Sequence, residues 1–173
     1  MEAEQDNFSR IPGEPVAYWV SKEIYIDFDH PTLYSISNPC KGIDTGNNDK
    51  FLRMWFEIDC EKQLFPSKSS ICAKTISGKK WVPYNKGGDY RLWYGNNYYL
   101  INWESNGAEI IHYGRSNLRN RKYYFMSGVT WSTITSGRSS FRYFCNGFLF
   151  DNGGSCLFTN NDIFYIQGFL NSA

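Results

Sequence analysis

The chain has 173 residues, a formal net charge of +1, 42% hydrophobic residues and 18% aromatic residues, which is enough for a globular domain and excludes a disordered chain. It has no run of about 18 apolar residues and no basic-then-apolar leader, so we expect neither a membrane span nor secretion. The five cysteines are an odd number without a C-x-x-C pair, and there are two histidines. This pattern predicts a reduced, cytoplasmic protein without a disulfide framework or a metal site.

The basic residues are concentrated in the middle of the chain. Residues 79–142 hold ten Lys and Arg against three Asp and Glu, whereas residues 1–78 hold eight against twelve and residues 143–173 hold none against two. A segregated basic region is what a polyanion-binding module needs, although a solvated charged face would give the same pattern.

The first 30 residues predict a tail followed by a helix. Residues 1–10 are polar and acidic, and we expect them to be a tail or the end of a linker, with one domain over 11–173. Apolar residues recur at three and four residue intervals over 16–28, which predicts an amphipathic helix with Trp19 and Ile24 facing the core. His30 precedes a proline and so ends this helix.

A polar loop over 40–50 is expected to lead into a strand over 51–58. In this loop Asn47, Asn48 and Lys50 are positioned to hydrogen-bond a ligand. The alternative is that the loop satisfies its own backbone through Asx turns.

The rest of the chain is predicted to form short strands rich in aromatic residues. Glycines mark the turns between them, and residues 105–107 are expected to be a polar connection. A final helix begins near Ile163, with Asn160 or Asn161 as its cap. The predicted class is α+β, a single domain with a mostly antiparallel, aromatic-rich sheet and flanking helices. The expected strands cover residues 79–84, 91–94, 98–103, 123–126, 129–133, 140–143 and 148–150.

The stretch 81–97 combines aromatic rings, two cations, three glycines and three asparagines in seventeen positions. This composition suits a recognition loop. Around Lys86, glycines expose backbone N–H groups and permit close approach, and Arg91 offers paired donors to a phosphate or a base edge. An ordinary hairpin turn between aromatic strands is the alternative.

The most basic window of the chain is residues 114–122, with four cations in nine positions. Charges of one sign this close together repel one another unless an anion relieves them. The window therefore favours a polyanion contact over a merely solvated loop.

No motif of an enzyme is present. The sequence lacks G-x-G-x-x-G after a strand, G-x-x-x-x-G-K-[ST] and G-x-S-x-G. The pair Asn38-Pro39 is followed by Cys40-Lys41, so it does not complete the Asn-Pro-Pro-Tyr type of motif with which amino-methyltransferases hold a flipped adenine. We assign no catalytic residue, no metal and no cofactor to this chain, and a free-standing enzyme is the least favoured class.

Several runs together resemble the C-terminal specificity region of adenine-specific DNA methyltransferases of BREX phage-defence systems, the PglX type. The resemblance spans nearly the whole chain and implies a target recognition domain, similar to those of restriction-modification systems. A separate catalytic domain would flip the adenine and use S-adenosylmethionine. The last helix ends after barely two turns, as expected for a fragment of a longer enzyme. The runs that carry the resemblance are residues 11–20, 45–55, 86–96, 128–132, 147–155 and 168–172.

Under this hypothesis the partners are double-stranded DNA and the methyltransferase domain of a parent chain. The alternative is a protein-interaction module that docks on an acidic partner, either another defence-system subunit or a phage DNA mimic. The expected phosphate contacts are Lys79, Lys80, Lys86, Arg115, Arg119, Arg121 and Lys122. The expected base or groove contacts are Asn47, Asn48, Asn85, Arg91, Asn96 and Arg138, with Lys50 beside them.

Overall fold

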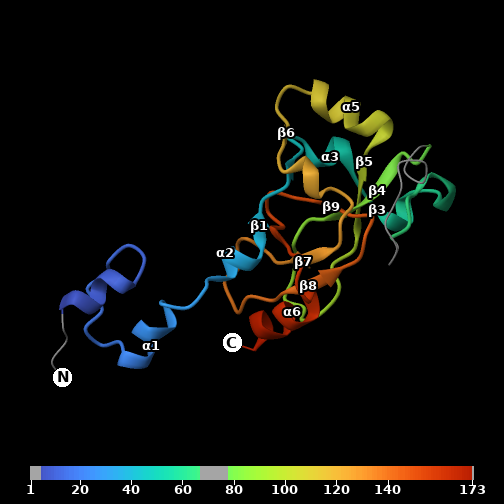
Figure 1. Ribbon diagram of the computed structural model, residues 1–173. Coiled ribbons are helices and arrows are strands. Elements are labelled where there is room, and N and C mark those ends of the chain that lie inside the picture. The colour runs from blue at the N-terminus through green and yellow to red at the C-terminus, as the bar shows by residue number, and fades with distance from the viewer. Residues whose placement is uncertain (1–4, 67–77, 173) are drawn as a thin grey trace. The chain divides into compact units, whose positions relative to one another are not determined.

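The computed structural model describes residues 5–66 and 78–172, and the chain divides into two compact units, one up to Ser37 and one from Asn38 (Figure 1). The first unit contains a 3₁₀ helix η1 (Gln5–Arg10) and the helices α1 (Lys22–Asp27) and α2 (Leu33–Ile36). Its main internal contacts are the Tyr25 hydroxyl donating to the Ala17 carbonyl at 2.6 Å and an Arg10–Asp29 ion pair at 3.2 Å.

The helix predicted over 16–28 is wrong in length and in orientation. Only α1 is helical, because Ser21 takes an extended N-cap conformation and separates it from the preceding turn. Trp19 and Ile24 are 67% and 46% exposed, so neither side chain faces a core. The three and four residue spacing was real, but the turn at 18–20 interrupts the helix it predicted.

The second unit has three sheets. One is four-stranded with the order β3-β5-β4-β9, where β3 is Leu52–Met54, β5 Tyr99–Asn102, β4 Trp81–Asn85 and β9 Leu149–Phe150. A second four-stranded sheet has the order β1-β10-β7-β8, formed by Asn38–Cys40, Cys156–Phe158, Gly128–Thr130 and Arg142–Phe144. The strands β2 (Ile43–Asp44) and β6 (Asn117–Leu118) form a separate pair.

Among the named strands of the described residues, every pair is antiparallel except β4 with β9, which is parallel. The core between the elements is dominated by aromatic rings. Trp103 meets Tyr124 edge to face at 5.6 Å between ring centroids, and Tyr124 meets Phe150 at 5.8 Å. The α+β class, the mostly antiparallel pairing and the aromatic-rich core are therefore confirmed.

Two helices lie at opposite ends of the second unit in Figure 1, α5 (Glu104–His112) and α6 (Ile163–Asn171). The helix α6 was predicted, but its cap was assigned wrongly. Asp162 is the N-cap, and its carboxylate accepts from the backbone N–H groups of Phe164 and Tyr165. The helix α5 was missed, because residues 105–107 were expected to be a connection. They adopt left-handed backbone angles within its first turn, where the Gly107 Cα packs on the Trp103 ring.

The predicted strand over 51–58 is also wrong in extent. The helix α3 (Asn48–Phe51) ends where β3 begins, and the 3₁₀ helix η2 (Trp55–Glu57) follows. The Glu57 carboxylate reaches back to the Met54 N–H at 2.6 Å and closes that turn. A second 3₁₀ helix, η3 (Cys60–Lys62), follows after Asp59.

Five of the other predicted strands are confirmed in shortened form, as β4, β5, β7, β8 and β9. The strands expected at 91–94 and 123–126 are wrong. The first is a loop with an isolated bridge from Trp93 to Arg142, and Tyr123 ends the 3₁₀ helix η4 (Arg121–Tyr123). Phe125 has a positive φ of 68°, which is incompatible with a strand.

Candidate nucleic-acid interface

The pairing of β2 with β6 brings two distant polar segments together. Ile43 lies opposite Leu118, and the Asn120 side chain donates to the Lys41 carbonyl at 2.8 Å. Gly46 packs so closely on the backbone of Arg115 that a Cβ would lie 2.7 Å from its carbonyl oxygen. The loop 41–47 therefore lies directly beside the basic window 114–122.

A turn at residues 151–154 connects these segments to the loop that follows β4. The Asn152 N–H donates to the Ile43 carbonyl at 2.9 Å, and its side chain accepts from the Arg119 guanidinium at 3.0 Å. On the other side of the turn, a Cβ on Gly154 would lie 2.7 Å from the backbone nitrogen of Gly87. The turn thus places Lys86 and Gly87 next to the basic window.

We call the resulting patch the basic surface. Its cations come from three segments that are far apart in the sequence and converge around the turn 151–154. Each is exposed except Lys86, which is partly exposed and lies over the Tyr99 ring at 5.0 Å. The basic surface consists of Lys41, Lys86, Arg115, Arg119, Arg121 and Lys122.

Sequence reasoning missed Lys41. Lys41 lies outside the basic middle of the chain, in the loop 40–50, which was predicted from its turn-forming residues rather than from charge. The strand pairing that places it beside Asn120 is two residues long on each side, and such short strands leave no alternation to detect.

The one carboxylate in the turn 151–154 is turned inward. Asp151 accepts hydrogen bonds from the Gly153 N–H at 2.5 Å and from the Tyr84 hydroxyl at 2.8 Å. Burial raises the pKa of Asp151, and these hydrogen bonds oppose that shift. Burial likewise raises the pKa of Tyr84, which is fully enclosed. The turn is therefore anchored to the core through its acidic residue.

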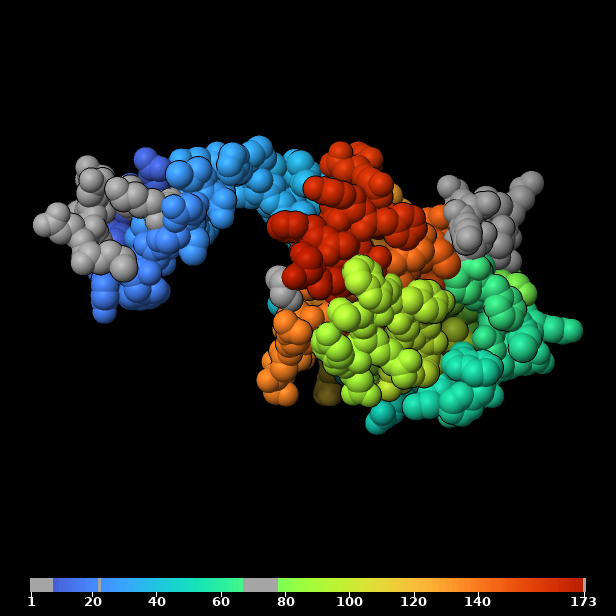
Figure 2. Space-filling view, turned by 90° about the horizontal axis from the view of Figure 1, so that it is seen from below, coloured from blue at the N-terminus to red at the C-terminus, as the bar shows by residue number. Residues whose placement is uncertain are grey.

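The loop after β4 is held in shape from within. The buried Asn96 side chain donates to the Asp89 carbonyl at 2.8 Å, and the Arg91 N–H donates to the Ser140 hydroxyl at 3.3 Å. The Trp93 carbonyl accepts from the Tyr143 N–H at 2.8 Å and from the Gln167 side chain at 2.7 Å. In Figure 2 this loop lies beside α6, which is red. Its glycines at 87, 88 and 95 all have positive φ, a backbone region that glycine adopts readily.

A groove of about 800 Å³ lies between this loop and the segment that joins β7 to β8. Gly88, Asp89 and Tyr90 form one wall, and residues 134–138 form the other. Arg138 lines the groove, and Ile134 is 92% exposed. The predicted contact residue Arg138 therefore lies at the entrance of a concave surface.

The other lysines expected to contact phosphate lie elsewhere. Lys80 forms an ion pair with Glu104 at 2.8 Å, and the Lys79 ammonium donates to the Glu61 carbonyl at 2.7 Å. Both precede β4, whereas Lys86 follows it, and a five-residue strand separates its ends by about 17 Å. The structure does not bring Lys79 and Lys80 to the basic surface.

Lys50 is also paired. It lies 3.0 Å from Glu109, and the hydrogen bond with Lys50 is the main cause that lowers the pKa of Glu109. The same ammonium lies 5.2 Å from the centroids of both the Phe51 and Tyr113 rings. The Glu109 carboxylate of α5 therefore already balances the charge of Lys50 before any contact with DNA.

The asparagines expected to read bases have internal partners or are buried. Asn47 caps α3 by accepting from the Lys50 N–H, and Asn48 accepts from the Thr45 hydroxyl at 2.8 Å. The loop 40–50 thus satisfies its own polar groups, as the Asx-turn alternative predicts. Asn85 and Asn96 are 3% and 5% exposed, so their side chains lie beneath the surface rather than on it.

Within residues 5–66 and 78–172, no group of three or more His, Cys, Asp and Glu side chains is arranged to hold a metal ion. In the same described part of the chain, no helix has the length and apolar character that a membrane crossing requires. Asn38 and Pro39 lie in β1, paired with Phe158 and Leu157, and do not form a loop that would hold a flipped adenine.

The fold and the surface define a small α+β module whose cations converge on one turn. No model of a known protein family matches the chain. It is similar to two curated proteins. It is 40% identical over 179 residues to the adenine-specific methyltransferase PglX of Lacticaseibacillus casei (strain Zhang), an alignment that covers 97% of this chain and 15% of that protein. It is 40% identical over 169 residues to the adenine-specific methyltransferase BrxX of Escherichia coli O9:H4 (strain HS), covering 96% of this chain and 13% of that protein.

The chain thus spans about one seventh of the length of the relatives that it matches. The similarity runs through nearly the whole of this chain, which includes every segment of the basic surface. It supports the resemblance to adenine-specific methyltransferases of the PglX and BrxX type and identifies the matching part as a small region of them.

Proposed function

We propose that this chain is a sequence-specific duplex-DNA recognition module of an adenine-specific DNA methyltransferase in phage defence. The observation that carries the proposal is the convergence of Lys41, Arg119 and Lys86 from three separate segments on the turn 151–154. The phosphate backbone of a duplex is the extended anion that such a surface fits, and Arg and Lys side chains are its usual contacts.

The groove beside the loop 86–97 supplies the second part of the proposal. Its rim carries Arg138 and the exposed backbone around Gly88, next to the phosphate-binding cations. Phosphate contacts fix the register of a protein on DNA, and the adjacent loop then reads base edges. Because Asn85 and Asn96 are buried, we assign base contacts to Arg91 and Arg138 instead of these two amides.

Methyl transfer is not assigned to this chain. The residues present do not fit S-adenosylmethionine, so binding of that cofactor and flipping of the adenine belong to the remaining length of proteins such as the two relatives. The isolated chain is expected to bind DNA without methylating it.

A salt titration of binding to a pool of short random-sequence duplexes tests this function. Neutralising about six phosphates makes log affinity fall with log salt at a slope of roughly −5. Arg119→Ala removes one of these contacts and reduces the slope by about 1. Arg119→Lys is the matched control, because it keeps the charge and therefore the slope. Sequencing of the retained duplexes is expected to yield an enriched motif.

Absence of binding at low salt overturns the proposal in favour of a module that docks on an acidic protein. Binding with an unchanged slope in Arg119→Ala contradicts the assignment of the basic surface. Binding without an enriched motif contradicts the sequence-specific part of the proposal.

A further inference from the structure

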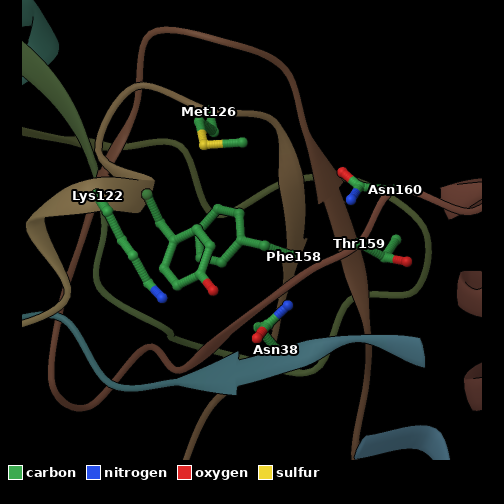
Figure 3. A pocket seen from close by; sticks show the side chains of 7 residues that line it. Asn38, Lys122, Met126, Phe158, Thr159 and Asn160 are labelled. Atoms are coloured by element: carbon green, nitrogen blue, oxygen red, sulfur yellow. The ribbon is translucent and has the colours of Figure 1, made fainter. Parts of the chain in front are cut away.

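A second, smaller cavity lies at the margin of the basic surface, between β1, η4 and β10. Its volume is about 240 Å³, and it is lined by Asn38, Lys122, Tyr123, Met126, Phe158, Thr159 and Asn160. Figure 3 shows the labelled side chains surrounding the opening, with Lys122 on one side and Asn160 and Thr159 on the other. Pockets that enclose whole drug-sized ligands span roughly 300 to 1,000 Å³, so this one fits a single ring system.

The inner wall of the cavity is aromatic and rigid. Tyr123 and Phe158 are stacked with ring centroids 4.6 Å apart and an interplanar angle of 3°. Phe158 is 2% exposed and belongs to the core, whereas Tyr123 is partly exposed. A flat aromatic platform backed by the core is the kind of surface on which unpaired nucleobases stack.

The polar groups of the cavity match the remaining parts of a nucleotide. Lys122 places its ammonium 4.9 Å from the Tyr123 ring centroid. Because its side chain is exposed, it can leave the ring for a phosphate. Asn38 and Asn160 are exposed carboxamides at the edge of the opening, Asn38 below it and Asn160 to its right in Figure 3. Each offers a donor and an acceptor to a base edge.

We propose that this cavity binds one unpaired nucleotide of a DNA strand whose neighbouring phosphates lie on the basic surface. This inference rests on the proposed function and deepens it. The base stacks on the platform of Tyr123 and Phe158, Asn38 and Asn160 contact its edge, and Lys122 binds its phosphate. Arg121, the preceding residue of η4, continues the phosphate track toward Arg119.

The test compares short duplexes that contain a single bulged nucleotide with fully paired duplexes of the same sequence. The chain is expected to bind the bulged duplex at least about fivefold more tightly, as stacking of one base on an aromatic side chain predicts. The double variant Asn38→Ala, Asn160→Ala keeps the aromatic platform but removes the edge contacts, so it is expected to reduce this preference and to keep the affinity for paired DNA. Arg115→Ala is the matched control, because it weakens binding to both duplexes by the same factor.

Equal affinity for bulged and paired duplexes overturns the pocket assignment and leaves the proposed function intact. A preference that is unchanged in the double asparagine variant also overturns it. A free deoxynucleoside monophosphate that binds as tightly as the bulged duplex assigns the cavity to free nucleotides and overturns the DNA assignment. Loss of binding to every duplex counts against the proposed function itself.

Discussion

At the scale of single residues, the site is shaped by side chains that face inward. Asp151 and Tyr84 hold the turn 151–154 to the core, and the Tyr84 hydroxyl lies within hydrogen-bond distance of both the Asp151 carboxylate, at 2.8 Å, and the Ile43 carbonyl, at 3.0 Å. Gly42 lies so tightly against β9 that a Cβ would collide with the Phe150 carbonyl. The backbone segments next to the exposed cations are therefore tightly packed and have little freedom to move.

Asp151→Asn tests this anchoring through pH. Burial raises the folded-state pKa of Asp151 above its ordinary value of 3.8, so the folded protein favours the protonated acid. That contribution to the free energy of unfolding is present below pH 3.8 and is lost as the pH rises through the folded-state pKa. Asparagine cannot ionise, and its oxygen still accepts from the Gly153 N–H.

The stability of Asp151→Asn relative to the wild type is therefore expected to increase from about pH 4 toward neutral pH. Urea unfolding at a series of pH values measures this difference. The same trend is expected at high salt, because burial rather than long-range charge causes the shift. A difference that shrinks with rising pH contradicts the stated environment of Asp151.

At the scale of secondary-structure elements, α6 supports the loop after β4. Gln167 is 4% exposed, and its amide donates to the Trp93 carbonyl at 2.7 Å and to the Phe141 carbonyl at 3.0 Å. Asn171, one turn further, donates to the same Phe141 carbonyl at 2.8 Å. The helix thus holds the loop after β4 at Trp93 and the segment that follows the groove at Phe141.

Replacing Gln167 with leucine is expected to lower the free energy of unfolding by about 1 to 2 kcal/mol. The cost stays moderate because Trp93 and Phe141 each keep another donor, Tyr143 and Asn171 respectively. Affinity for duplex DNA is expected to fall with no change in the salt slope, since no cation is removed. Tyr165→Ala on the same helix, 77% exposed, is the control and is expected to change stability by less than about 0.5 kcal/mol. A changed salt slope in Gln167→Leu would argue that the loop itself binds phosphates.

The elements also show how far the sequence could predict this fold. The strands β4 and β5 were found because aromatic and β-branched residues run through them between turn formers. The helix α5 was not, since Ser105, Asn106 and Gly107 are residues typical of turns and adopt left-handed backbone angles there, with Gly107 close to the Trp103 ring. The helix over 16–28 failed for another reason, because the turn at 18–20 interrupts the segment with apolar spacing.

The candidate site, like the fold, could be predicted only in part from the sequence. The window 114–122 stood out by charge, and its cations are exposed as expected. The burial of Asn85 and Asn96 could not be read from composition, since the same amides occur on surfaces and beneath loops. The membership of Lys41 and the exclusion of Lys80 depend on strand pairing and on Glu104, and neither is encoded in a local pattern.

At the scale of the whole molecule, two groups of basic residues differ in how their charge is balanced. The cations near α5 are matched by Glu104 and Glu109, which leaves that end nearly neutral. The cations around the turn 151–154 have no comparable carboxylate partner among the described residues except the inward-facing Asp151. Arg142 is withdrawn altogether, since it is 1% exposed and burial lowers its pKa. Among the described residues, these two groups of cations therefore differ in whether a carboxylate balances them.

Substitution of the two lysines at opposite ends of β4 distinguishes what each group contributes to DNA binding. Lys86→Ala is expected to reduce the salt slope of duplex binding by about 1, because it removes a phosphate contact of the basic surface. Lys80→Ala removes the same charge from the α5 end and is expected to leave the slope unchanged. Its effect on stability should stay within about 1 kcal/mol, because the pair with Glu104 is exposed to solvent. Fluorescence anisotropy titrations of both variants over a range of salt concentrations make the comparison. Equal slopes for the two would mean that the duplex follows β4 along its whole length, and the basic surface would then have to be redrawn to include α5.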